Sequence, residues 1–359
     1  MTETPASTKL AVVLLNLGGP AKEADIAPFL FNFFRDKNVI TLPNPFRYLL
    51  AAWISQSRAR GAARKSYGLL GGKSPLLENT RAQAAALEKE LQKKNPPPGF
   101  SSARVFVSMR HWHPMADEVA KEVAAYQPDK IILLPLYPQF STTTTFSSLQ
   151  DWRRAAAAAG LQVPTETVCC YPSNPGFVAA SAALIQQEFR KAPHRIRVLF
   201  SAHGLPEKII RAGDPYQRQC EQSAAAIVKQ LDMPALGQSE LDWQLCYQSR
   251  VGRLKWIGPS VEEALEKAAD DKVGVIIYPL AFVSEHVETL VELDIDYRRR
   301  AEAMGIHPFL RASTVGTHPR FIEGLRDLVN GARGERNCPE TFSKCCRAEK
   351  DERKDEEKK

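Results

Sequence analysis

The sequence predicts an α/β fold in which parallel sheets are covered by helices. Its short β-rich runs are apolar at consecutive positions, which is typical of strands buried on both faces. Helical patterns separate these runs, and a regular alternation of strand and helix gives parallel sheets. The length of 359 residues allows one large or two medium domains with a sizeable core.

The expected elements follow from these patterns in chain order. Apolar runs predict strands at 10–15, 104–108, 130–136, 167–170, 196–201, 243–246 and 273–280. Helical periodicity predicts helices at 74–93, 114–126, 174–191, 214–231, 260–269, 285–304 and 319–330. The three prolines at 96–98 predict a loop, because proline fits neither a helix interior nor a central strand.

Two of the expected strands resemble each other. The segments at 131–137 (IILLPLY) and 275–281 (VIIYPLA) each combine a buried strand with a proline near its end. This likeness suggests two similar halves with a cleft between them. We expect a flexible N-terminus at 1–9, one half at 10–191, a second half at 192–330 and a tail at 331–359.

Composition excludes several classes of protein. With 44% hydrophobic and 25% charged residues, the chain is globular rather than disordered. It lacks an apolar run of roughly 18 residues and a secretory signal pattern, so we expect a cytoplasmic protein. Seven cysteines in such a chain favour thiols or metal ligands over disulfides. Gly18-Gly19-Pro20 predicts a tight turn, and without a GxGxxG motif or P-loop we expect no nucleotide cofactor.

The net charge of +7 is localised. Between Asp36 and Glu78 no acidic residue occurs, while seven basic residues occur there beside an apolar, aromatic run at 46–54. Such a stretch suits an anionic partner, either an acidic ligand or an anionic membrane surface. We expect no nucleic acid, because no nucleic-acid-binding motif accompanies the charge. A solvated helix face without acids is the plainer alternative.

His203 is the first candidate for chemistry. It ends a buried strand and is followed by Gly204-Leu205-Pro206, which forbids simple continuation of the strand. Ligands of α/β sheets bind at the carboxyl ends of strands, so a histidine there is placed to meet a substrate. A core histidine satisfied by hydrogen bonds is the alternative.

An acidic row is the second candidate. Glu285, Glu288, Glu292 and Asp296 are spaced by 3, 4 and 4 residues, which places them on one face of an α-helix. Like charges at this spacing repel, and a row of hard oxygen ligands is what a route for a divalent cation needs. His286 is expected to point elsewhere. An amphipathic helix packed on a sheet is the alternative.

Several motifs in this order resemble the ferrochelatase family. The resemblance covers about residues 10–330. The motifs are LLNLGGP at 14–20, GGKSPL at 71–76, YPQ at 137–139, SAHGLP at 201–206, GDPY at 213–216, YQSRVG at 247–252, WIGP at 256–259 and the segment 282–294. The resemblance implies two Rossmann-like domains flanking a porphyrin cleft, and insertion of Fe²⁺ into protoporphyrin IX in the last step of haem synthesis.

The resemblance also implies roles for the two candidates. His203 matches the family's essential histidine, and Glu288 matches the carboxylate facing it across the porphyrin. Either could take pyrrole protons while the other handles iron. Glu285 falls where some relatives have Asp and is expected among the iron ligands, and Glu292 and Asp296 would continue an outward acidic path for protons or iron.

Porphyrin contacts are implied in the same way. Residues at or near positions that pack the ring are Leu14, Tyr67, Trp256 and Phe282, although each could equally be a core side chain. Arg110 matches a cleft arginine of the family, and Arg58, Arg60 and Ser74 are candidates for propionate contacts. A hydrophobic lip near 37–77 would form the ligand mouth and contact the inner membrane peripherally, which favours protoporphyrin over coproporphyrin.

Three cysteines near the end, Cys338, Cys345 and Cys346, resemble the C-terminal cysteines of ferrochelatases that carry a 2Fe-2S cluster. Such a cluster needs four thiolates, and Cys170 or Cys169 is the better candidate for the fourth. A tail of free thiols is the alternative. A homodimer is expected by analogy.

Two other functions are compatible with the sequence. A haem or porphyrin carrier on the same fold would keep the aromatic and basic mouth but would not need His203 opposite Glu288. A cobalt chelatase of the same superfamily usually presents additional metal-binding histidines, whereas this chain has seven in total.

Overall fold

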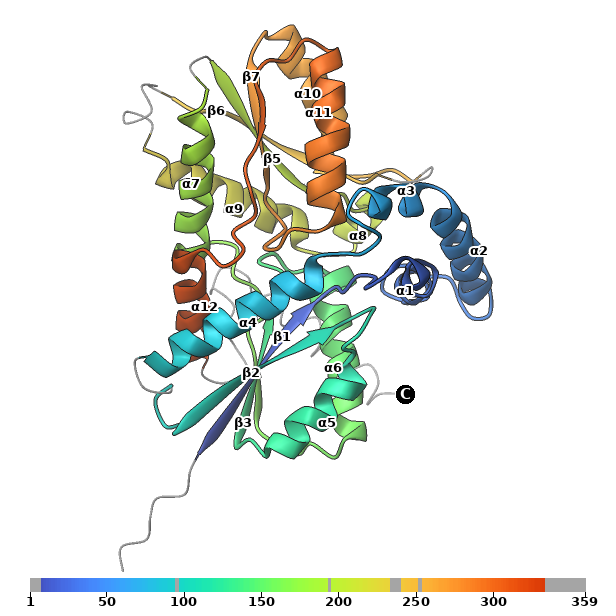
Figure 1. Ribbon diagram of the computed structural model, residues 1–359, viewed down its shortest axis with the longest axis vertical. Helices are drawn as coiled ribbons and strands as arrows, with labels where there is room; N and C mark the ends of the chain where they lie inside the picture. Colours follow the sequence, from blue (N-terminus) through green and yellow to red (C-terminus); the bar gives the residue numbers. More distant parts are fainter. Residues whose placement is uncertain (1–7, 94–96, 193–194, 233–239, 251–253, 333–359) are drawn as a thin grey trace, which may run out of the picture. The chain divides into compact units, whose positions relative to one another are not determined.

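The computed structural model describes residues 8–93, 97–192, 195–232, 240–250 and 254–332. The tail cysteines Cys338, Cys345 and Cys346 lie outside the described residues. The chain divides into two compact units. Unit 1 takes its described residues from Met1–Tyr137, Ser141–Cys170 and Ile322–Lys359, and unit 2 from Pro138–Phe140 and Tyr171–Phe321. Figure 1 shows the ribbon of both.

Unit 1 is an α/β unit with a four-stranded parallel sheet. Its elements are β1 (Lys9–Asn16), the 3-10 turn η1 (Glu23–Asp25), α1 (Ile26–Phe34), α2 (Phe46–Arg60), α3 (Ala62–Gly68), α4 (Leu76–Lys93), β2 (Ser102–Met109), α5 (Ala116–Tyr126), β3 (Lys130–Pro135), the π-turn η2 (Thr142–Phe146), α6 (Ser147–Ala158), β4 (Thr165–Thr167) and most of α12 (Pro319–Gly331). The strand order is β2-β1-β3-β4.

Helices α5 and α6 cover one face of this sheet. Apolar side chains from β1, β2 and β3 pack there against both helices, around the fully buried Trp152. Helix α4 packs against β2, and α1 and α2 pack against each other (Figure 1). Burial of consecutive residues of β1 agrees with the continuous apolar pattern of the strand.

Unit 2 repeats the same topology. Its elements are α7 (Pro175–Phe189), β5 (Ile196–His203), α8 (Glu207–Arg211), α9 (Tyr216–Gln230), β6 (Asp242–Gln248), α10 (Val261–Asp270), β7 (Gly274–Pro279), the π-helix η4 (Glu288–Asp296), α11 (Tyr297–Ala303) and β8 (Phe309–Arg311). The strand order is β6-β5-β7-β8, and all pairs are parallel. Side chains of α10 and α11 pack with β5, β6 and β7 in one core.

The two sheets confirm the predicted α/β class and the predicted likeness of two halves. Strands β3 and β7, which contain the similar segments, hold the same place in their sheets and both end in proline. The short strand β8 was not predicted, and β4 ends at Thr167, where a strand was expected to begin. The division falls at Tyr171 rather than near residue 192, because α7 packs on α9 and β7 of unit 2.

The helix predicted at 285–304 differs from the structure. A single α-helix was expected from Glu285 to Met304, but a π-helix occupies Glu288–Asp296 and α11 begins only at Tyr297. Residue spacing alone does not distinguish the two helix types. Among the described helices, none combines the length and apolarity needed to cross a bilayer.

Candidate active site

The carboxyl end of β5 positions His203. It is the last residue of the strand and is paired in register with Gln248, the last residue of β6. The next residue must be small, because a Cβ atom on Gly204 would lie 3.0 Å from the Gln248 carbonyl oxygen and 3.3 Å from the Trp256 ring. The main chain at Trp256 bridges to Pro206. The indole of Trp256 is therefore held beside the residue that follows His203.

Glu288 lies against His203. It is the first residue of η4, and its Oε2 atom is 3.1 Å from Nδ1 of His203. The side chains retain 36% and 30% of their exposure, so both can be reached from solvent. π-helical turns are rare and concentrate at functional sites. The two candidate residues are therefore in direct contact within unit 2, whereas the resemblance implied that they face each other across the porphyrin.

The pair is electrostatically coupled. Burial disfavours a charged imidazole at His203, but the neighbouring Glu288 carboxylate outweighs burial and raises the pKa of His203 above its usual 6.5. Burial also disfavours ionisation of Glu288, yet the His203 and His286 rings outweigh it and hold the pKa of that carboxyl well below its usual range. Each side chain therefore favours the charged form of the other, and the contact between imidazole and carboxylate is the shared cause of both shifts.

His286 belongs to the site, contrary to the expectation that it points elsewhere. Its Nε2 atom lies 3.7 Å from Oε2 of Glu288, the same oxygen that faces His203. The ring is buried, packs on Phe282 with centroids 4.5 Å apart, and its Nδ1 has no hydrogen-bond partner among the described residues. The sequence signal was available, since His286 lies two residues before Glu288.

Glu292 lies one turn further along η4 and is held by the loop after β6. It accepts hydrogen bonds from the backbone N–H of Ser249 (3.0 Å), the Ser249 hydroxyl (2.6 Å) and the Gln248 amide (3.3 Å). Ser249 adopts a left-handed φ of 60°, a strained conformation that aims its N–H at the carboxylate. Burial and the Glu288 charge raise the pKa of Glu292.

The remaining acids of the predicted row behave differently. Asp296 ends η4 and is exposed. Glu285 precedes the helix, and its carboxylate bonds to Arg311 (2.9 Å) and to the backbone N–H of Thr314 (2.9 Å). The prediction that all four acids share one α-helical face is therefore wrong for Glu285, because the helix starts after it and a distant arginine binds it.

No group of three or more His, Cys, Asp or Glu side chains is arranged to hold a metal ion within the described part of the chain. The apolar residues expected around the ring remain partly exposed in unit 2: Trp256 and Phe282 are both half-buried. The buried indole N–H of Trp256 lacks a hydrogen-bond partner among the described residues.

Comparison with known proteins decides the family. The family model for ferrochelatases matches residues 9–333. The ferrochelatase of Caulobacter vibrioides strain NA1000 is 50% identical over 340 residues, covering 94% of each chain, and that of Phenylobacterium zucineum is 49% identical over 350 residues, covering 94% of this chain and 98% of its own.

The chain belongs to the ferrochelatase family. Ferrochelatases are lyases that insert metal into a porphyrin for haem synthesis, and this chain is an enzyme of that class with porphyrin and ferrous iron as substrates. Among solved structures, SirB from Bacillus subtilis with Fe3+ matches with a TM-score of 0.54 at 12% identity, covering 91% of this chain and 96% of that chain. This likeness concerns the fold.

Unit 1 contains the other residues that the ferrochelatase resemblance implied as porphyrin contacts. Among them, Arg110 forms ion pairs and a hydrogen bond within unit 1. Its guanidinium contacts Asp36 at 2.8 Å, the Ser147 hydroxyl at 2.7 Å and Asp151 at 3.6 Å. Burial disfavours ionisation of Asp36, but Arg110 outweighs it and lowers the pKa of that carboxyl. Arg110 therefore serves an internal ion-pair cluster, and its porphyrin contact stays a prediction.

Leu14 is a core residue rather than a ring contact. It lies in the middle of β1, between Val107 and Leu134 of the flanking strands, and is 0% exposed. The alternative of a core side chain, left open from the sequence, therefore applies to Leu14. Tyr67 is also buried.

Two turns meet at Ser74. Its backbone N–H donates to the Pro20 carbonyl at 2.8 Å, and a Cβ atom on Gly19 would collide with its side chain at 2.6 Å. Ser74 is nearly buried. It therefore packs against the Gly-Gly-Pro turn predicted after the first strand.

The lip predicted near 37–77 contains α2 and α3. Exposed large apolar side chains gather along the first half of α2, and Trp53 is 69% exposed. Arg58 and Arg60 lie in the last turn of α2, where Arg58 is partly buried over the Phe34 ring at 5.5 Å and Arg60 is exposed. The apolar and basic residues thus share one helix.

Proposed function

We propose that this chain inserts Fe²⁺ into protoporphyrin IX, with His203 accepting the pyrrole protons and Glu288 stabilising the protonated ring. The observation that carries this proposal is the 3.1 Å contact between Nδ1 of His203 and the Glu288 carboxylate at the end of β5. Two N–H protons must leave the macrocycle for each metal ion inserted, so a base of this kind is required.

The two ring nitrogens of the His203 imidazole have different roles. Nδ1 is engaged by Glu288, which leaves Nε2 to meet the substrate. When Nε2 takes a proton, the adjacent carboxylate stabilises the imidazolium, as an orienting acid does for a catalytic histidine. Glu292 is the next acceptor, because its raised pKa suits a group that gains and loses a proton. Asp296, exposed at the end of η4, would release the proton to solvent.

Iron would travel along the same side of η4. Imidazole and carboxylate oxygen are both ligands of ferrous iron, and a set of fewer than three protein ligands binds it transiently. We assign His203, Glu288, Glu292 and Asp296 to this path. Glu285 is left out, because its carboxylate is taken by Arg311 and Thr314.

The porphyrin would meet apolar and basic contacts. In unit 2, Trp256 lies beside Gly204, Phe282 packs on His286, and both rings are partly exposed. From unit 1, Arg58 and Arg60 would bind propionates, and the apolar lip supports the choice of protoporphyrin, which carries two carboxylates fewer than coproporphyrin.

We assign α2 to an anionic membrane surface. Its exposed aromatic and aliphatic side chains, next to arginines and without an acidic residue, are the composition that lies at a lipid interface. A cytoplasmic enzyme held peripherally at the inner membrane could take hydrophobic porphyrin directly from lipid. The homodimer stays a prediction.

A 2Fe-2S cluster is proposed as a structural group. Cys338, Cys345 and Cys346 would supply three thiolates and Cys170, or its neighbour Cys169, the fourth, which gives the donor set that such a cluster needs. Both body cysteines are buried just after β4 in unit 1. Anaerobically purified protein should be red-brown and lose this absorption in Cys338→Ser, while Cys220→Ser keeps it. A colourless preparation supplied with iron contradicts the cluster.

An anaerobic assay with protoporphyrin IX and Fe²⁺ tests the function. We expect haem absorption to grow over many turnovers with the wild type and with His307→Ala, which alters an exposed histidine. His203→Ala should abolish turnover while porphyrin still binds. Stoichiometric binding without turnover in the wild type would instead favour a porphyrin carrier, and preference for Co²⁺ and a corrin precursor would favour a cobalt chelatase.

A further inference from the structure

One arginine on β8 contacts carboxylates at two places along the catalytic segment, through a hydrogen bond to Glu285 and through an ion pair, without a hydrogen bond, to Asp294. Arg311 Nη1 lies 2.9 Å from Oε1 of Glu285, which precedes η4, and its Nε lies 3.2 Å from Oδ2 of Asp294, near the end of η4. The arginine side chain is only 11% exposed. A planar guanidinium can hold two carboxylates in fixed positions, which an ammonium group on a flexible stem cannot do.

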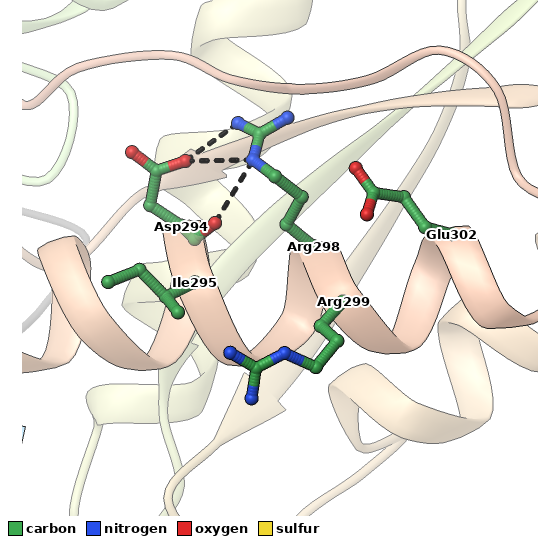
Figure 2. Close-up of a pocket in the computed structure, with 5 residues that line it drawn as sticks. All are labelled: Asp294, Ile295, Arg298, Arg299 and Glu302. Atoms are coloured by element: carbon green, nitrogen blue, oxygen red, sulfur yellow. Dashed lines mark hydrogen bonds and ion pairs between the residues drawn. The ribbon is translucent and has the colours of Figure 1, made fainter.

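Each carboxylate is also tied to a second group. Glu285 accepts a short hydrogen bond from the Thr289 hydroxyl, and Thr289 follows Glu288 directly. Asp294 accepts from Nη2 of Arg298 at 2.6 Å, and Figure 2 shows the Arg298 guanidinium folded over this carboxylate. Arg298 in turn donates from Nη1 to the Phe309 carbonyl on β8 at 2.6 Å. Together these contacts form a row of alternating acidic and basic side chains, Glu285–Arg311–Asp294–Arg298, that is bound to β8.

The catalytic carboxylates lie between these two anchors. Glu288 and Glu292 fall within the stretch from Glu285 to Asp294, but neither contacts Arg311 in the described structure. A π-helix is rare and occurs mostly as a single turn inside an α-helix, so we infer that this nine-residue stretch depends on its tertiary contacts. Within the described part of the chain, the side-chain partners of Glu288 are His203 and His286, and these do not set the path of the backbone.

We propose that Arg311 is a positioning residue for the metallation reaction: by anchoring Glu285 and Asp294 to β8 it holds the intervening π-helix so that the Glu288 carboxylate stays at hydrogen-bond distance from His203. This inference rests on the proposed function of Glu288. It also gives Glu285 a role in support of the backbone in place of the iron ligation expected from sequence.

A second buried arginine in unit 2 provides a matched control. Arg197 is 8% exposed and bridges Asp242 and Asp271, each at 2.8 Å. It lies at the amino end of β5, whereas His203 ends the same strand. Arg197→Met therefore removes an equally buried, two-carboxylate arginine from the same sheet without touching the support of η4.

The experiment compares Arg311→Met, Arg311→Lys, Arg197→Met and Glu288→Gln as full-length proteins. Steady-state anaerobic metallation gives kcat and KM for porphyrin, and amide hydrogen exchange with mass spectrometry follows the peptide spanning 285–297. Arg311→Met should lower kcat by about 10- to 100-fold, the range of losses seen when a supporting group behind a functional ligand is removed, with KM changed less than about twofold. Exchange across 285–297 should accelerate in this variant.

The conservative variant and the control make the inference falsifiable. Arg311→Lys keeps the charge and should fold even if Arg311→Met does not, with kcat between the wild type and Arg311→Met. Arg197→Met should keep the wild-type kcat and exchange at 285–297. Unchanged kcat and exchange in folded Arg311→Met or Arg311→Lys, or an equal loss in Arg197→Met, would overturn the positioning role. If Glu288→Gln itself leaves kcat unchanged, the proposed function fails instead.

Discussion

Ser249 donates two hydrogen bonds to Glu292, one from its backbone N–H at 3.0 Å and one from its hydroxyl at 2.6 Å. Both come from a residue with a left-handed φ of 60° immediately after β6. Strain of this kind persists only where the surroundings demand it, and it occurs here at the second carboxylate of the proposed proton path. The loop after β6 is therefore part of the site.

Loss of the Ser249 hydroxyl should destabilise unit 2 and raise the pKa of Glu292 further. Ser249→Ala leaves the backbone donor and the Gln248 amide in place, so we expect a cost of about 1 kcal/mol in free energy of unfolding, at the low end for a buried polar group that loses one partner. Urea unfolding measures this cost. Ser173→Ala, at an exposed serine, should cost nothing measurable, and equal stability of the two variants would contradict the role of the hydroxyl.

Gly204→Ala should displace the Trp256 indole. The new Cβ atom would lie 3.0 Å from the Gln248 carbonyl oxygen and 3.3 Å from the Trp256 ring, so backbone or indole must move. We expect a loss of about 1–3 kcal/mol in stability, typical of overpacking, together with weaker porphyrin binding in a fluorescence titration. Gly331→Ala, where nothing lies within 4 Å, is the control. Wild-type porphyrin affinity in Gly204→Ala would exclude Trp256 as a ring contact.

The exposed face of α2 should control membrane binding. Replacing Phe46, Leu49 and Trp53 together by serine removes apolar surface that would enter the lipid, so binding to anionic vesicles in a sedimentation assay should fall by at least about tenfold. Wild-type binding should also weaken as salt screens the arginines. Leu254→Ser, at an exposed leucine of unit 2, should bind as the wild type does. Equal binding by the triple variant would contradict the interface.

Glu288→Gln should lower the pKa of His203. In the wild type the neighbouring Glu288 carboxylate outweighs burial and raises this pKa, and an uncharged amide leaves burial opposed only by the weaker effect of the Glu292 charge. An NMR titration of the His203 imidazole resonances measures the change, with Glu266→Gln, at an exposed position on α10, as the control. A pKa that stays where it is in Glu288→Gln would mean that the two side chains do not interact in solution.

The interaction between His203 and Glu288 should stabilise the folded protein over a limited pH range, with one limit set by each side chain. Because the folded pKa of His203 is raised, its contribution is complete below about pH 6.5, the usual pKa, and is lost as pH rises through the folded value. Because the folded pKa of Glu288 is lowered, its contribution is present above its usual 4.5 and is lost in stronger acid. The stability advantage of the wild type over Glu288→Gln in urea unfolding should therefore be largest between these limits. An advantage that does not vary with pH would contradict the ion pair.

The sequence was sufficient to predict the architecture, and it indicated His203 and Glu288 as candidates, which the structure places in contact. Continuous apolar runs marked six of the eight described strands and overlapped β4 only at Thr167. Strand-end placement singled out His203, since the carboxyl ends of parallel strands meet at one edge. The missed strand, β8, has only three residues and so carries too little pattern to be recognised.

The wrong expectations concern residues whose surroundings are set by the fold and not by their local spacing in the sequence. Glu285 was assigned to the acidic row by its spacing, but its partner Arg311 is far along the chain and reaches it only through the fold. Leu14 was taken as a ligand contact although an apolar residue in a strand interior is a core residue in most cases. His286 was expected to point elsewhere, but the π-helix begins only at Glu288 and the His286 imidazole lies beside that carboxylate.

The pH dependence of kcat/KM, compared between the wild type and Glu288→Gln, tests the central claim most directly. His203 must be neutral to accept a pyrrole proton, so kcat/KM should rise as pH increases through the pKa of the free enzyme's imidazole. In Glu288→Gln the maximum should fall and this acid limb should move to lower pH, because the imidazole no longer has a carboxylate beside it. An acid limb at the same pH in both proteins would show that the His203–Glu288 pair does not take the proton.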